Sequence, residues 1–249
     1  MSVARRTVPL RSTCAQPHPC SAAMRQTILG QIPIFQDLAA DEVAGLADRM
    51  LSLSWGPGDT LFTTGEASEH VFVLAAGQAK TFRSTTSGQS TSLDFLGPGD
   101  MLGSLTALDA GRYSETAVAL VTTCALRLES GAFRQVLLTH PPVALRVLDV
   151  VVDRLHRARS MEAEQASTTV TTRVAATLLR LSDTFGMPGE RTGTTLIQLP
   201  LTRADLAAMT GTSAESVSRA MSGLRRDGLI DSGRRWTVVL DRPGLMAAK

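Results

Sequence analysis

The sequence predicts an α+β fold in three parts: a β-rich N-terminal region, one long helix and a C-terminal winged helix. Short apolar runs separated by glycine-containing turns fill residues 28–140. An apolar 4-3-4-3 repeat follows over residues 141–166, and residues 167–249 contain two short helical patterns joined by a glycine. Residues 1–27, with four arginines and no acidic residue, are expected to form a flexible tail.

Regular alternation of strands and turns characterises the β-rich region. Predicted strands cover residues 60–64, 71–74, 80–84, 93–96 and the longer apolar run 117–128. The turn sequence Gly-Pro-Gly-Asp occurs twice, at residues 56–59 and 97–100, and a short helix is expected over residues 41–50. Short strands at this spacing indicate a sandwich, a roll or a barrel.

The long helix carries a narrow apolar stripe, which is the pattern of a coiled-coil seam. The stripe consists of Ala144, Leu148, Val151, Leu155 and Ala158. It predicts a dimer interface, and the alternative is a helix packed against its own domain. The polar, β-branched stretch at residues 167–172 is expected to be a hinge.

Two start signals for helices lie close together near the C-terminus. Thr202 with Asp205 and Thr212 with Glu215 each place a hydroxyl and a carboxylate at capping-box spacing, and Gly211 between them permits a sharp reversal. This layout is typical of a helix-turn-helix, whose second helix enters the major groove of DNA.

The second helix, over residues 213–225, has one apolar and one polar face. Val217, Met221 and Leu224 form the apolar stripe. The polar face presents Glu215, Ser218, Arg219 and Ser222. Arginine pairs with guanine, a carboxylate accepts from cytosine and serine is adaptable, so this face is suited to reading bases. Thr202 and Ser213, near the helix starts, complete the predicted DNA-binding set. The alternatives are that Glu215 only caps the helix, that Arg219 is a solvated charge and that Ser218 has no role.

A β-wing is expected after this helix. An extended run starts at Leu229, Gly233 marks a turn, and apolar and polar residues alternate over residues 236–241. Arg234 and Arg235 stand at the turn and are suited to holding phosphates.

Charge and composition narrow the function classes. Net charges of +4, −6 and +4 on residues 1–27, 28–167 and 168–249 sum to +2, so the C-terminal part suits a polyanion. No apolar run approaches twenty residues and no secretory signal is recognisable, so we expect a cytoplasmic protein without a membrane segment. Three cysteines then suggest thiols or metal ligands, and no catalytic motif indicates an enzyme.

These features together resemble the Crp–Fnr superfamily of bacterial transcription regulators. The resemblance covers about residues 28–243 and rests on both Gly-Pro-Gly-Asp turns, Gly65-Glu66, Gly77, Leu102-Gly103, the long helix and the run 212–219. It implies an N-terminal cyclic-nucleotide-binding-type β-roll, a long dimerisation helix and a C-terminal winged helix-turn-helix. The implied protein is a homodimer that binds double-stranded DNA and acts with RNA polymerase.

Two parts of the chain indicate which branch of this superfamily it resembles. Members that bind cyclic AMP have an arginine for the phosphate where this chain has Ser114-Glu115, so the resemblance argues against cyclic AMP unless Arg112 substitutes. The candidate effector pocket comprises Gly103, Ser104, Arg112, Ser114 and Glu115. The pattern Glu215-x-x-Ser218-Arg219 is similar to the Fnr branch, which implies a TTGAT-like inverted repeat.

The cysteines also resemble part of the Fnr pattern, which implies a [4Fe-4S] cluster and an oxygen signal. Cys14 and Cys20 lie in the tail, and Cys124 lies where the family has its central cysteine. A cubane needs four ligands, so His18 or a carboxylate would complete the set. The alternatives are haem or nitric-oxide sensing, thiol redox chemistry, a nucleotide signal, or no small-molecule signal, with Cys124 as a buried strand residue. A nucleotide-binding module acting on a protein partner is the alternative function.

Overall fold

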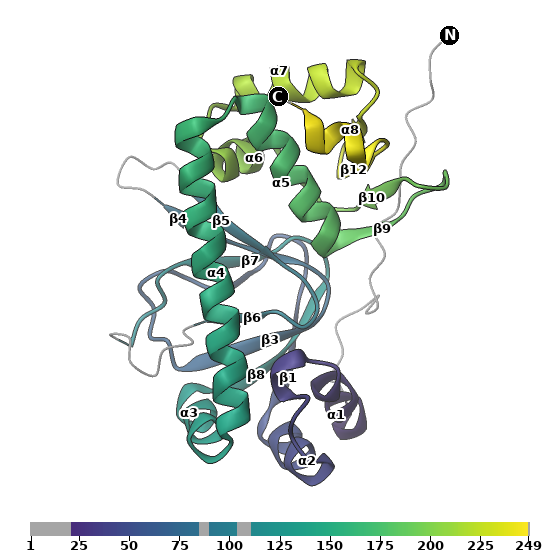
Figure 1. Cartoon of the computed structure of the whole chain (residues 1–249). Helices are drawn as coiled ribbons and strands as arrows, with labels where there is room; N and C mark the ends of the chain where they lie inside the picture. Colours follow the sequence, from purple (N-terminus) through teal and green to yellow (C-terminus); the bar gives the residue numbers. More distant parts are fainter. Residues whose placement is uncertain (1–20, 85–89, 104–110, 249) are drawn as a thin grey trace. The chain divides into compact units, whose positions relative to one another are not determined.

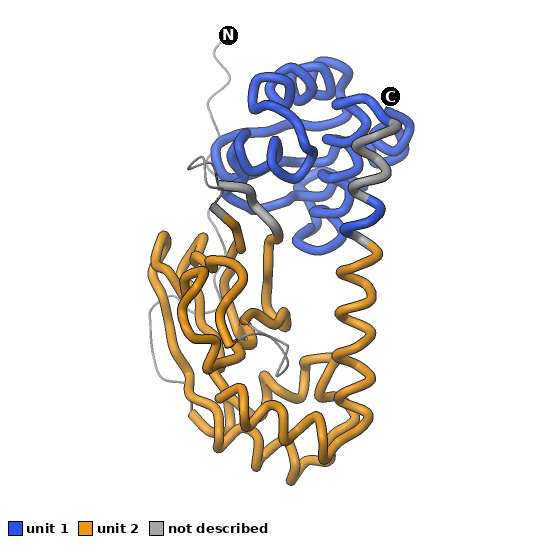
Figure 2. Tube along the Cα trace, turned by 90° about the vertical axis from the view of Figure 1, so that its left-hand side faces the viewer, with its two compact units in different colours: residues 1–11, 157–249 blue, residues 12–156 orange. Residues whose placement is uncertain are grey.

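The chain divides into two compact units (Figure 2). The computed structural model describes residues 21–84, 90–103 and 111–248. Among the described residues, one unit lies within residues 21–156 and the other comprises residues 157–248. The division falls inside the long helix α4 (Pro141–Ser167), which we expected as a separate segment over residues 141–166. Its first part joins the N-terminal unit because Val143 and Val147 are buried in that unit's core.

The N-terminal unit contains two antiparallel four-stranded sheets among its described residues (Figure 1). The sheet orders are β1-β8-β3-β6 and β2-β7-β4-β5. The strands are β1 (Leu51–Trp55), β2 (Thr60–Phe62), β3 (His70–Ala76), β4 (Ala79–Ser84), β5 (Ser90–Leu96), β6 (Met101–Gly103), β7 (Thr116–Ala119) and β8 (Thr123–Glu129). The helices are α1 (Ala22–Gly30), the 3-10 helix η1 (Pro33–Phe35), α2 (Ala40–Arg49), α3 (Ser130–Thr139) and the first part of α4. The expected helix over residues 41–50 and the α+β fold class are confirmed.

The apolar strand region predicted over residues 117–128 consists of two strands, β7 and β8. β7 pairs with β4 in one sheet, whereas β8 pairs with β1 and β3 in the other. The chain changes sheets between them, where the Thr123 hydroxyl donates to the carbonyl of Val121 over 2.8 Å. Both strands are largely buried, so their apolar composition is nearly continuous and does not mark the break.

The repeated Gly-Pro-Gly-Asp sequence forms the same turn at both places. In each, the aspartate carboxylate accepts from the first glycine's N–H, over 2.7 Å for Gly56–Asp59 and 2.8 Å for Gly97–Asp100. The third residues, Gly58 and Gly99, have φ of 91° and 92°, which a residue with a Cβ rarely adopts. These local rules are why the sequence alone located both turns.

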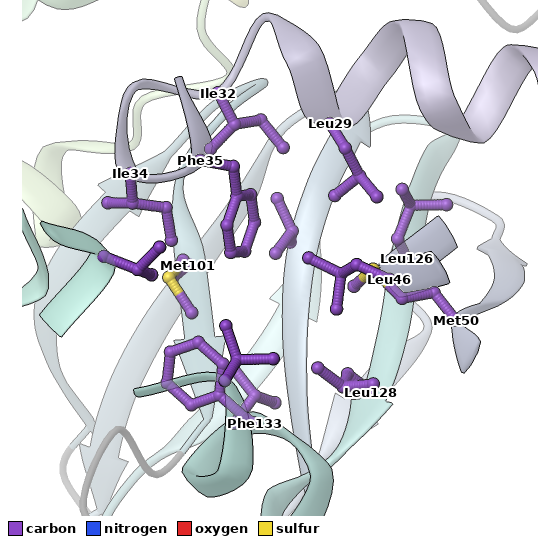
Figure 3. Packing of buried hydrophobic residues seen from close by; sticks show 14 of the residues in the cluster. Leu29, Ile32, Ile34, Phe35, Leu46, Met50, Met101, Leu126, Leu128 and Phe133 are labelled. Atoms are coloured by element: carbon purple, nitrogen blue, oxygen red, sulfur yellow. The ribbon is translucent and has the colours of Figure 1, made fainter. Parts of the chain in front are cut away.

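Helices cover one face of the β1-β8-β3-β6 sheet and form the larger core (Figure 3). Leu29, Phe35, Leu46 and Phe133 reach into it from four helical segments. Leu29 belongs to α1, which starts at Ala22, so the expected tail over residues 1–27 is too long. A nine-residue helix with one buried side chain gives little periodic signal in the sequence.

The C-terminal unit has the predicted winged helix with a larger sheet than expected. Its elements are α5 (Val170–Phe185), β9 (Gly186–Pro188), β10 (Thr195–Ile197), α6 (Arg203–Thr210), α7 (Ala214–Arg226), β11 (Ile230–Gly233), β12 (Trp236–Val239) and α8 (Arg242–Ala247). The sheet order is β11-β12-β10-β9, so a second hairpin extends the wing. Where we expected a hinge over residues 167–172, the non-helical break comprises only residues 168–169, because the Thr169 hydroxyl accepts from Thr172 N–H and α5 starts at Val170.

Within the described residues, no single helix is long and apolar enough to cross a membrane. Helix α3 and the first part of α4 reach that length and composition only as a pair bent by 114°.

Candidate DNA-binding surface and ligand site

The first helix of the helix-turn-helix starts with a complete capping box. The Thr202 hydroxyl accepts from the N–H of Asp205 over 3.0 Å, and the Asp205 carboxylate accepts from the N–H of Thr202 over 3.0 Å. Asp205 is buried, whereas Thr202 is exposed. Two otherwise unsatisfied N–H groups are thereby paired, and α6 is fixed at the predicted residue.

The turn between the helices follows from one glycine, but the second cap differs from the prediction. Gly211 has φ 60° and ψ 44°, the left-handed conformation that ends α6. Helix α7 is capped by Ser213, whose hydroxyl accepts from the N–H of Ser216 over 3.1 Å. The predicted Thr212–Glu215 box is therefore wrong, because α7 starts one residue later and Thr212 N–H donates to Ala207.

Helix α7 separates a buried face from an exposed one. The predicted apolar residues are buried, and Ala220, which we did not single out, is buried with them. Because this face is held in the core of the unit, the opposite face is fixed toward solvent.

The exposed face carries all four residues predicted to read bases, Glu215, Ser218, Arg219 and Ser222. The Arg219 guanidinium lies 3.5 Å from the Glu215 carboxylate, with the two side chains 72% and 80% exposed. An ion pair this exposed is weak, so both groups can exchange it for contacts to bases at little cost. The Ser218 hydroxyl donates to Ala214 over 2.9 Å, which leaves its oxygen as an acceptor.

The wing turn presents two neighbouring guanidinium groups. Arg234 and Arg235 are exposed between β11 and β12, where Gly233 pairs with Trp236. Arg235 has φ 75°, the left-handed region that is uncommon for residues other than glycine. The chain thus holds two cations at the tip of a tight hairpin.

Sequence reasoning missed Arg203, the first residue of α6. Burial, followed by the nearby Arg225, lowers the pKa of Arg203 from its usual value. Arg203 is itself exposed, so the first turn of α6 presents a cation next to the predicted Thr202. The signal in the sequence was an arginine directly after the capping threonine.

The stripe of α4 that we predicted as a dimer seam is mostly exposed. Leu148, Val151 and Leu155 are 55%, 42% and 48% exposed, Ala158 is exposed and Ala144 is half-buried. The helix instead uses a neighbouring stripe, with Val143, Val147 and Val150, to pack on its own unit. Leu145 and Val152 widen the exposed apolar face, and the sequence pattern did not single them out.

The four predicted effector residues that the structure describes, Gly103, Arg112, Ser114 and Glu115, have different surroundings. Gly103 ends β6, and the Arg112 guanidinium donates to the carbonyl of Gly65. Ser114 is exposed, and its carbonyl accepts from Arg83 Nε over 3.0 Å. Ser104 lies outside the described residues. Glu115 is half-buried directly before the start of β7.

Burial raises the pKa of the Glu115 carboxyl, and the charge of Asp94 acts in the same direction. Arg154, the Thr81 hydroxyl and Arg83 lower it, in that order, and do not fully offset the effect of burial. Arg154 belongs to α4, and its Nη2 donates to the carbonyl of Met101 over 2.9 Å, so α4 contacts β6 there.

The described residues do not supply a metal centre. Cys124 is buried on β8, opposite Ser54, and Cys14, Cys20 and His18 lie outside the described residues. Across residues 21–84, 90–103 and 111–248, no group of three or more His, Cys, Asp or Glu side chains is arranged to hold a metal ion. An iron–sulfur cluster therefore does not fit the described part of the chain by itself.

Comparison with known proteins identifies both halves of the chain. Residues 52–140 match the cyclic nucleotide-binding domain, and residues 172–248 match the Crp-like helix-turn-helix domain. The chain is 30% identical over 202 residues to the Cyclic AMP receptor protein of Thermus thermophilus, covering 81% of this chain and 89% of that protein. It is 26% identical over 190 residues to the transcriptional activator protein FnrA of Stutzerimonas stutzeri, covering 76% and 77%.

The fold agrees with these matches. The solved structure of FixK2 from Bradyrhizobium japonicum covers 80% of this chain and 96% of its own, with a TM-score of 0.69 and 22% identity. Because relatives named for cyclic AMP and for Fnr both align, similarity along the chain does not select a branch. Both domains match, and one helix joins the roll to the winged helix. The chain therefore belongs to the Crp–Fnr superfamily of DNA-binding transcriptional regulators, which are not enzymes.

Proposed function

We propose that the chain works as a homodimer that binds a TTGAT-like inverted repeat through α7, under control of a redox, oxygen or nitric-oxide-type signal. The observation that carries the proposal is the exposed triad Glu215, Ser218 and Arg219 on the first turns of a helix whose other face is buried. These turns are the part of a recognition helix that reaches base edges. The carboxylate, hydroxyl and guanidinium supply an acceptor for cytosine, an adaptable group and a bidentate donor for guanine.

The exposed apolar face of α4 supports the dimer. Three of its side chains, Leu148, Val151 and Leu155, follow coiled-coil spacing and are each more than two-fifths exposed. A second copy of the same helix would cover them and would present two copies of α7 to two half-sites. A regulator of this kind would act in the cytoplasm with RNA polymerase at a promoter.

Binding to short duplexes tests the sequence preference. Fluorescence anisotropy would compare an inverted TTGAT repeat, an inverted TGTGA repeat and a scrambled duplex at one fixed salt concentration, because phosphate contacts depend strongly on salt. We expect the tightest binding to the TTGAT repeat with two chains per duplex. Equal affinity for all three duplexes would refute the proposed recognition.

The proposed redox-type signal depends on the cysteines, and a separate measurement tests it. Cys124 is buried in the roll, and we propose that it acts together with Cys14 and Cys20. Iron and acid-labile sulfide would be measured on anaerobically prepared protein, before and after exposure to air. Protein without iron or sulfide that nevertheless binds the TTGAT repeat would remove the cluster from the proposal and leave DNA recognition intact.

The second candidate is a cyclic-AMP-responsive regulator. It is favoured by the name of the Thermus thermophilus relative. The half-buried Glu115 carboxylate weighs against it, because an anionic phosphate there would meet like charge.

A further inference from the structure

Arg173 of α5 connects the end of the long helix to the turn of the helix-turn-helix. Its Nε donates to the carbonyl of Thr210 over 2.8 Å, and its Nη1 donates to the carbonyl of Thr168 over 2.6 Å. Thr210 is the last residue of α6, and Thr168 directly follows the last residue of α4. One half-buried guanidinium group therefore holds the C-terminal ends of two helices that are far apart in the sequence.

The position of Arg173 is unfavourable for α5 itself. Arg173 lies near the start of α5, at the positive end of that helix's dipole, where acidic residues are preferred. The carbonyls at the end of a helix, by contrast, have no intrahelical partner and attract a cation. By sequence, α4 and α6 have no basic residue in their own last turns. Arg173 supplies the cation that both helices lack, so its role lies in joining them.

The bridge acts on the segment that leads into the recognition helix. Thr210 is buried, and its hydroxyl donates to the carbonyl of Leu206 over 2.6 Å, so the end of α6 offers a fixed acceptor. Gly211 reverses the chain directly after Thr210, and α7 starts at Ala214. Apolar packing of α5 against α6 and α7 is non-directional, whereas the N–H groups of a guanidinium are held in a rigid fork. Arg173 therefore adds a directional contact that sets how α5 holds this turn.

The other end of the bridge is the short junction between α4 and α5. The Thr169 hydroxyl accepts from Thr172 N–H over 3.2 Å, and the Thr169 carbonyl accepts from the N–H of Arg173 over 3.1 Å. The backbone and side chain of Arg173 thus bind Thr169 and Thr168, which together are the whole break between the two helices. A movement of this break therefore displaces the guanidinium group as well.

We propose that Arg173 is a positioning residue that ties the junction of α4 and α5 to the turn of the helix-turn-helix, so that a displacement at the end of α4 reaches α7 through this guanidinium group. The inference rests on the proposed function for its biological meaning, because it describes how a signal carried by the long helix would alter the presentation of the base-reading face. Arg173→Lys would keep the charge but would bind one carbonyl at a time, because an ammonium group is a single point charge.

Amide hydrogen exchange on the full-length protein without DNA tests the bridge. The reporter is the N–H of Thr212, which donates to the carbonyl of Ala207 over 3.0 Å across the turn. Arg173→Met and Arg173→Lys should each accelerate this exchange by about tenfold or more, because hydrogen bonds from a charged group hold the turn closed. Exchange of the hairpin amides over residues 236–239 should stay unchanged, because Arg173 is not bonded to that hairpin by Nε or Nη1.

Two more substitutions separate coupling from stability. Arg180→Lys is the matched control, because Arg180 is likewise half-buried on α5 and its Nη2 donates to the Thr177 hydroxyl of the same helix over 3.5 Å. It should leave the exchange of Thr212 unchanged. Thr169→Ala loosens the junction by removing the cap of α5. It should accelerate the exchange of Thr212 in the wild-type background but add nothing in the Arg173→Lys background, which is the non-additivity expected of linked sites.

Several results would overturn the inference. These are unchanged exchange of Thr212 in Arg173→Met, wild-type exchange in Arg173→Lys, an equal effect of Arg180→Lys, and an equal effect of Thr169→Ala in both backgrounds. Equal acceleration of the hairpin amides would also overturn it, because it would indicate general destabilisation of the unit. Arg173→Lys keeps the charge, so it provides the measurement if Arg173→Met fails to fold. No readout involves DNA, so failure of the TTGAT proposal is recognised separately.

Discussion

Replacing Arg219 by alanine separates base reading from all other roles of α7. A bidentate contact between arginine and guanine discriminates by about 1–3 kcal/mol. A symmetric dimer would lose it twice, about 2–6 kcal/mol in total, or roughly 30-fold to 20,000-fold in affinity. The intramolecular pair with Glu215 spans 3.5 Å with both side chains mostly exposed, so removing it should cost about 0.5 kcal/mol or less in stability.

The measurement is anisotropy on the TTGAT repeat and on duplexes with each half-site base pair changed in turn. Arg219→Ala should lose affinity for the repeat and should no longer distinguish one particular base pair, while its melting temperature stays near that of the wild type. Arg226→Ala is the matched control, because Arg226 is 81% exposed at the other end of the same helix. Unchanged affinity, or an equal loss on every duplex, would show that Arg219 does not read a base.

Three further outcomes are expected. Leu148→Glu should convert the proposed dimer to a monomer in light scattering. Leu138→Glu, at a similarly exposed leucine on α3, is the control and should leave the dimer intact. A dimeric Leu148→Glu protein would show that this stripe is not the dimer interface. Ser213→Ala should lower the free energy of unfolding of the C-terminal unit by about 1 kcal/mol in urea, and Thr212→Ala should lower it by clearly less. A larger loss for Thr212→Ala would show that Thr212 is the cap of α7. Burial and Asp94 raise the pKa of Glu115, so the folded state binds more protons than the unfolded state. The free energy of unfolding should therefore fall as the pH rises through the interval above the ordinary pKa of 4.5. Glu115→Gln should melt at a higher temperature than the wild type at neutral pH, and this difference should vanish in acid.

Local chemistry decided which elements the sequence could predict. The box of Thr202 and Asp205 and the reversal at Gly211 depend on residues at most three positions apart, and the structure has both. The second cap was misplaced because Thr212 and Ser213 are adjacent hydroxyl residues, and the choice between them depends on how α7 packs. The three-residue strands β9 and β10 show too little alternation to be recognised.

Contacts between distant segments were beyond a reading of the sequence. The influence of the Arg154 charge on Glu115 links the segment before β7 to a helix 39 positions later, and no periodicity predicts it. Likewise, the α4 repeat identified an apolar stripe but not that the adjacent stripe, with Val143 and Val147, packs on the roll. Both facts depend on how α4 packs against its own unit, which is set by contacts between segments far apart in the sequence.

The two stripes of α4 bring the contacts of this helix with the roll next to the proposed dimer contact. Arg154 lies on the stripe that packs on the roll, and Leu155, the next residue, lies on the exposed stripe. A group that changes how Arg154 is held therefore acts directly beside the proposed dimer contact. An effector alters DNA affinity only if it favours one arrangement of these contacts over another. In a dimer built on the exposed stripe, a signal that changed the contact of Arg154 with Met101 would therefore have to favour one arrangement of the neighbouring Leu155 over another in order to alter DNA affinity.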